Sequence, residues 1–104
     1  MQPSNLLKIE SLDQDWRDKD TVMLHACFQL LQDCVEKEQL LTGHIDWDAD
    51  ARHRAAKIEL QALYDWWLQR VDKENACDAL DAVCYEEDTA MLLRLVQLRW
   101  TLWT

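Results

Sequence analysis

Apolar residues recur at intervals of three and four along most of the chain, which is the spacing of one face of an α-helix. The clearest stretch follows Asp20, and its apolar positions are Leu24, Cys27, Phe28, Leu31, Cys34 and Val35. A second stretch carries Ala56, Leu60, Leu63 and Trp67. A third carries Leu80, Val83, Cys84, Met91, Leu95, Leu98 and Leu102. The pattern predicts three main helices, at residues 20–41, 48–73 and 75–103.

The boundaries of these helices rest on a few residues. Gly43 can adopt the left-handed conformation that commonly ends a helix, so the first helix should end just before it. Asp48 and Asp50 complement the N-terminal dipole of the second helix, and Asn75 can cap the third. The loop between the first two helices is expected to turn Trp47 inward.

Composition agrees with an all-α fold. The chain has one glycine and one proline, whereas tight hairpins and β-bulges depend on those residues. A second core would leave each half of 104 residues too small to be stable, so residues 1–104 should form a single domain. The expected architecture is a three- to four-helix bundle, with residues 1–19 as a short helix or an arm that docks on it.

The net charge of the chain excludes some classes of binding partner. The 20 acidic and 11 basic residues give a net charge of −9. This charge repels phosphate backbones and anionic membranes, so neither direct nucleic-acid binding nor membrane binding is expected. The natural partner is a protein with a basic surface.

No apolar run approaches the roughly 20 residues that span a bilayer, and residues 1–5 lack the features of a signal peptide. A cytoplasmic location is therefore expected, and with it four reduced thiols in the core, at Cys27, Cys34, Cys77 and Cys84. Two alternatives remain open. One is a pair of disulfides between helices, joining Cys27 to Cys77 and Cys34 to Cys84, and the other is a four-cysteine zinc site.

Carboxylates and imidazoles could converge on a divalent metal inside a helical bundle. The candidate ligands are His25, Glu36, His53, Glu59, Glu86 and Glu87. A metal-dependent nucleotide hydrolase that uses Mg²⁺ or Mn²⁺ is therefore the alternative function, although the E-x-x-E motif of helical pyrophosphohydrolases is absent. No glycine-rich phosphate loop or Gly-x-Ser-x-Gly motif occurs, so no catalytic residue is assigned.

Tryptophans and neighbouring acids are the candidate interface residues. They are Trp16, Trp47, Trp66, Trp100, Trp103, Glu86, Glu87 and Asp88. Trp100 and Trp103 lie one turn apart near the C-terminus, where they can seal the bundle or anchor a partner. An interface at that end would most simply serve self-association.

Several segments resemble small proteins of unknown function that tailed bacteriophages encode. These segments are residues 23–31 (MLHACFQLL), 35–38 (VEKE), 63–67 (LYDWW), 86–95 (EEDTAMLLRL) and 102–104 (LWT). The resemblance covers residues 20–104 and implies a compact acidic protein that binds a host enzyme or defence complex.

The leading hypothesis is accordingly a phage-encoded, acidic, non-enzymatic module in the host bacterial cytoplasm. It would bind a host or phage protein that has a basic surface, and so inhibit or redirect a host enzyme or defence complex. A structural or assembly oligomer is the second alternative.

Overall fold

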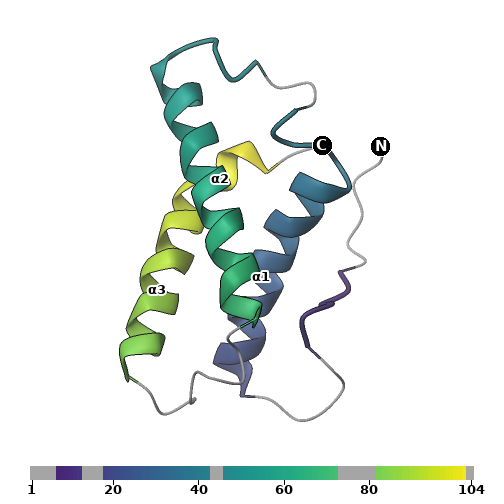
Figure 1. Cartoon of the computed structure of the whole chain (residues 1–104), viewed down its shortest axis with the longest axis vertical. Coiled ribbons are helices and arrows are strands. Elements are labelled where there is room, and N and C mark those ends of the chain that lie inside the picture. The colour runs from purple at the N-terminus through teal and green to yellow at the C-terminus, as the bar shows by residue number, and fades with distance from the viewer. Residues whose placement is uncertain (1–6, 13–17, 43–45, 73–81, 103–104) are drawn as a thin grey trace.

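The computed structural model describes residues 7–12, 18–42, 46–72 and 82–102. Its helices are α1 (Lys19–Glu36), α2 (Ala51–Asp72), α3 (Ala82–Gln97) and the short 3₁₀ helix η2 (Arg99–Thr101). The chain runs up through α1, down through α2 and up again through α3, and each helix contacts the other two (Figure 1). The predicted all-α bundle is therefore confirmed. Within the described part of the chain, no helix has the length and apolar character needed to cross a membrane.

The core is centred on aromatic contacts between α1 and α2. Phe28 stacks on Trp67, with ring centroids 4.9 Å apart and ring planes 18° from parallel. Trp66 also contacts Phe28, at 5.3 Å. The buried residues of α2 are Ala56, Leu60, Leu63 and Trp67, as the apolar spacing predicted. Leu95 joins them from α3, so all three helices contribute to one core.

Two buried polar residues on α1 hold the N-terminal segment. His25 and Gln29 are fully buried and lie one helical turn apart. The Ser11 hydroxyl lies 2.7 Å from Nδ1 of His25, and the backbone N–H of Glu10 donates to Oε1 of Gln29 at 3.0 Å. The segment 7–12 therefore docks on α1 through polar contacts, without forming a regular helix of its own.

Helix α1 ends at Glu36, five residues before the position predicted from Gly43. The chain reverses at Gln39, whose φ of 53° is in the left-handed region although the residue is not glycine. The N–H of Leu40 then donates to the carbonyl of Cys34 at 2.9 Å. This early reversal returns Leu40 and Leu41 to the core. Gly43 itself lies outside the described residues.

Helix α2 begins at Ala51, and Asp50 caps it by accepting the N–H of His53 at 2.8 Å. Before the cap, Trp47 is buried, and its indole N–H donates to the carbonyl of Leu40 at 3.1 Å. The predicted inward direction of Trp47 is confirmed.

Helix α3 ends at Gln97, where the sequence pattern alone extended the helix to residue 103. The chain then continues as the 3₁₀ helix η2. The hydroxyl of the buried Thr101 donates to the carbonyl of Leu98 at 2.7 Å. Asn75, the predicted cap of this helix, lies outside the described residues.

The described cysteines differ in whether they form a disulfide bond. Cys27 and Cys34 are free and partly buried, and burial raises the pKa of both thiols. Cys84 is disulfide-bonded, so the expectation of four reduced thiols is wrong for this residue. The alternative pairings of Cys27 with Cys77 and of Cys34 with Cys84 are also wrong, because Cys27 and Cys34 are both free.

Replacing Phe28 with alanine should lower the free energy of unfolding by about 3–5 kcal/mol, because it removes the stacked ring at the centre of the core. Urea denaturation measures this change. Met23→Ala is the matched control on the same helix, since Met23 is 57% exposed, and it should change stability by less than about 0.5 kcal/mol. Equal losses in the two variants would contradict the packing described.

Candidate functional site

Polar contacts join α2 to α3 along their shared edge. Arg70 and Asp88 form a nearly buried, two-pronged ion pair, with Nε–Oδ1 and Nη2–Oδ2 distances of 2.8 and 2.9 Å. One turn away on α2, the indole N–H of Trp66 donates to Glu87 at 2.7 Å. Paired, charge-assisted hydrogen bonds of this kind fix orientation as well as distance. They hold the two antiparallel helices in one register.

A third contact, between Glu59 and Arg94, continues this ladder toward the start of α2. Nε of Arg94 donates to Oε2 of Glu59 at 2.8 Å, and Nη2 donates to Oε1. The hydrogen bonds from Arg94 hold the pKa of Glu59 below its usual 4.5, against the opposing effect of partial burial. The same pairing raises the pKa of Arg94. Both side chains are thus ionised and occupied with each other at neutral pH.

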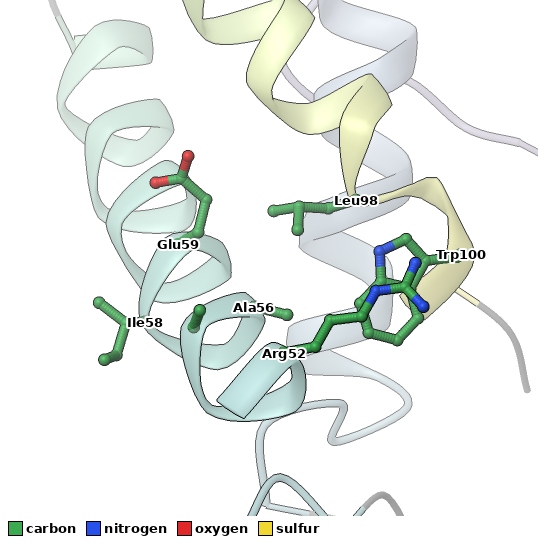
Figure 2. Close-up of a pocket in the computed structure, with 7 residues that line it drawn as sticks. Arg52, Ala56, Ile58, Glu59, Leu98 and Trp100 are labelled. Atoms are coloured by element: carbon green, nitrogen blue, oxygen red, sulfur yellow. The ribbon is translucent and has the colours of Figure 1, made fainter. Parts of the chain in front are cut away.

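Beyond this ion pair, a groove opens between the start of α2 and the end of α3 (Figure 2). Its volume is about 510 Å³, and its lining residues are Arg52, Ala55, Ala56, Ile58, Glu59, Leu98 and Trp100. The guanidinium carbon of Arg52 lies 3.9 Å from the centroid of the Trp100 ring, a cation–π contact that Figure 2 shows as one group lying across the other. The His53 ring also contacts Trp100 edge-on, with ring centroids 5.3 Å apart. The groove is therefore mostly apolar, with an arginine at its rim.

One side of α3 exposes apolar residues to solvent. Tyr85, Leu93 and Val96 are 53%, 60% and 54% exposed. Together with Thr89 they are spaced by four, four and three residues, which places them on one helix face, and Glu86 borders that face. We call these five residues the α3 outer face. Ile58, at the groove, is 73% exposed.

Charge is unevenly distributed along this surface. Glu86 and Glu87 are exposed near the beginning of α3. Arg52 and Arg99 are exposed at the opposite end, and neither has an acidic partner among the described residues. Acids near a helix N-terminus and bases near its C-terminus also complement the helix dipole. Exposed acids therefore lie near the beginning of α3, whereas the two arginines lie at the opposite end together with the exposed Asp48 and Asp50.

The structure places the predicted interface residues in different environments. Trp47 belongs to the core, Trp100 lines the groove and Glu86 borders the α3 outer face. Trp66, Glu87 and Asp88 take part in the ladder between α2 and α3. Trp16 and Trp103 lie outside the described residues. The sequence analysis missed Arg52, Ile58, Leu93 and Val96. An excess of apolar positions around α3 was the signal for Leu93 and Val96.

The six candidate metal ligands are engaged separately. His25 is in the core beside Trp67, His53 contacts Asp50, and Glu59 pairs with Arg94. Among the described residues, no three His, Cys, Asp or Glu side chains are placed to hold one metal ion.

Glu36 and Glu87 are also hydrogen-bonded. The Tyr64 hydroxyl donates to Glu36 at 2.6 Å, and this bond raises the pKa of Tyr64 to about 12. Glu87 accepts from Trp66, whereas Glu86 is exposed. The structure does not bring the six candidates into one site.

No protein-family model, curated protein or solved structure matches this chain. Its function is therefore argued from its own surface.

The Glu59–Arg94 pair should contribute to stability in a pH-dependent way. Because the pKa of Glu59 is lowered on folding, its contribution is present above the unfolded value of 4.5 and is lost as the pH falls through the folded value. Glu59→Gln should therefore be less stable than the wild type at pH 7, and the two should converge as the pH falls below 4.5.

Urea denaturation across this range measures the difference. Glu86→Gln is the control, since Glu86 is exposed and has no basic partner among the described residues. A constant gap between Glu59→Gln and the wild type at every pH would show that the ion pair does not form as described.

Proposed function

We propose that this chain is a non-catalytic protein-binding module, and that it binds through the α3 outer face and through the groove between α2 and α3. One observation carries the proposal: three large side chains on one face of α3 are more than half exposed, and an apolar groove lies between α2 and α3. Exposed apolar residues on a single helix face, and apolar grooves, are typical of interaction sites.

The polar residues of this region favour the same function. Those that face α2 are tied into the ladder between the two helices, so they are not available as a set of reactive groups. What remains accessible is apolar, with charges at its borders. Such a surface is suited to recognising another protein, in which apolar contacts supply affinity and border charges supply orientation.

The proposed partner is a host or phage protein with a basic surface. The net charge of −9 attracts such a partner at long range, and Glu86 adds a local negative charge beside Tyr85. The resemblance to small phage proteins favours a host enzyme or defence complex as the target. Binding would then inhibit or redirect that target.

Affinity capture from a lysate of phage-infected bacteria, quantified by mass spectrometry, tests the proposal. The wild-type chain should retain one stoichiometric partner. Leu93→Glu and Ile58→Glu should each reduce its recovery at least about tenfold, because they place a charge in the apolar surface. Met23→Glu is the matched control: it introduces the same charge on α1, at a side chain of similar exposure, and should retain the partner.

Circular dichroism checks that each variant keeps its helices. Equal recovery with all variants would show that the α3 outer face and the groove do not bind the partner. The absence of any stoichiometric partner would contradict the proposed function itself.

A further inference from the structure

We propose that the groove between α2 and α3 binds a short segment of the partner in which a large apolar side chain stands next to a single carboxylate. The apolar side chain occupies the groove, and the carboxylate pairs with Arg52. The inference deepens the proposed function, on which it rests only in taking the occupant to be a protein, and it names the chemistry that this groove recognises.

The shape of the groove comes from small side chains on α2. Four of its lining residues are spaced by three, one and three positions, which places them on one face of that helix. They are Arg52, Ala55, Ala56 and Glu59. An alanine side chain ends at its Cβ, and Leu98 and Trp100 lie across from Ala56 (Figure 2). The resulting volume of about 510 Å³ accommodates a large apolar side chain, which is favoured there because it leaves water.

The charge of the groove favours an anionic occupant. Among the described residues, two charged side chains line it, Arg52 and Glu59. Both carboxylate oxygens of Glu59 accept hydrogen bonds from Arg94, so the charge of Glu59 is compensated. Arg52 is exposed and forms no ion pair within the described ranges, since the nearby Asp50 caps α2 instead. The groove therefore has one uncompensated positive charge, in a chain whose net charge is −9.

Arg52 is held in a position suited to a carboxylate. Its guanidinium carbon lies 3.9 Å from the centroid of the Trp100 ring, and Figure 2 shows the guanidinium lying across that ring. A guanidinium that contacts a ring through its face keeps its N–H groups at its edges, where two of them can donate to one carboxylate. The His53 ring contacts the same indole edge-on and supports it. The arginine is thus oriented before a ligand binds, so less conformational entropy is lost on binding.

The number of charges decides between a carboxylate and a phosphate. One arginine compensates the single charge of an aspartate or glutamate side chain. A phosphate group carries more negative charge, and the net charge of −9 repels it. The occupant is therefore an acidic peptide segment rather than a nucleotide or a nucleic acid.

Such a segment can belong to a partner whose surface is basic as a whole. Attraction at long range depends on net charge, whereas recognition at contact depends on the groups that meet. The exposed Glu86 lies near the beginning of α3, and Arg52 lies at the opposite end of the bundle. A partner with a basic surface and one apolar, acidic segment is thus distinguished from proteins that are merely basic.

Titration of the ¹⁵N-labelled full-length chain with synthetic peptides, followed by NMR, tests the inference. The two peptides are acetyl-Ala-Leu-Glu-Ala-amide and the same sequence with Gln in place of Glu, which differ by one charge at nearly equal size. The Glu peptide should shift the amide signals of Ala55 and Ala56 and the indole N–H signal of Trp100, with a Kd in the millimolar range. The Gln peptide should bind roughly two- to fivefold more weakly, because it loses an exposed ion pair.

Two variants, each with a matched control on α2, locate the contacts. Arg52→Gln should bind both peptides equally, whereas Lys57→Gln removes the same charge from an exposed residue outside the groove and should keep the preference for Glu. Ala55→Leu should weaken both peptides by on the order of tenfold, because its side chain fills the groove. Ala62→Leu makes the same change at an exposed residue outside the groove and should bind as the wild type does. Circular dichroism checks the helices of each variant.

The inference is overturned if neither peptide shifts the signals of the groove, if the wild type binds both peptides equally, or if Arg52→Gln keeps the preference. Failure of the proposed function is seen separately. A chain that retains a partner from the lysate but does not distinguish the peptides contradicts this inference alone. A chain that prefers the Glu peptide but retains no partner contradicts only the proposed function.

Discussion

The arrangement of the bundle depends on how two adjacent tryptophans fix the rotation of α2. Neighbouring residues point about 100° apart on a helix, so Trp66 and Trp67 face different neighbours. Trp67 stacks on Phe28 and contacts the His25 ring edge-on, and both of these residues are on α1. Trp66 instead donates its indole N–H to Glu87 on α3. The indole N–H of Trp67 is buried without an acceptor among the described residues, which costs about 1–3 kcal/mol, so apolar packing must outweigh that loss.

This rotation decides which sides of α2 and α3 meet. It turns Glu59 and Arg70 toward α3, where Arg94 and Asp88 meet them, and it leaves Ile58 in solvent. Helix α3 consequently has apolar residues on two sides: Leu95 faces the core, and Leu93 lies on the exposed side. A surface helix of a monomer normally carries one apolar stripe. A second stripe is typical of a helix that has a partner on each side, which is the physical basis for assigning the α3 outer face to binding.

Periodicity was sufficient to predict the three helices and the buried residues of α2, because both depend on the spacing of apolar residues. It could not predict the end of α1, since the left-handed turn falls on Gln39, which has no strong preference for it. The burial of Gln29 also left no signal, because its partner is a backbone N–H in the N-terminal segment. For the site, the sequence identified Trp100 and Glu86. It did not identify the ladder, because a carboxylate that will meet an arginine on another helix is indistinguishable from one that could bind a metal.

The central claim is that the α3 outer face and the groove are open in the single chain and become covered on binding. Methyl NMR with a soluble paramagnetic agent measures this directly, because the agent relaxes each methyl group according to its contact with solvent. In dilute solution, the methyl groups of Leu93, Ile58 and Met23 should relax strongly, and those of Leu60 should not. When the partner retained by affinity capture is added, Leu93 and Ile58 should become protected while Met23 remains accessible. Protection of Leu93 and Ile58 already in the free chain, or equal accessibility of all three residues with and without the partner, would contradict the account.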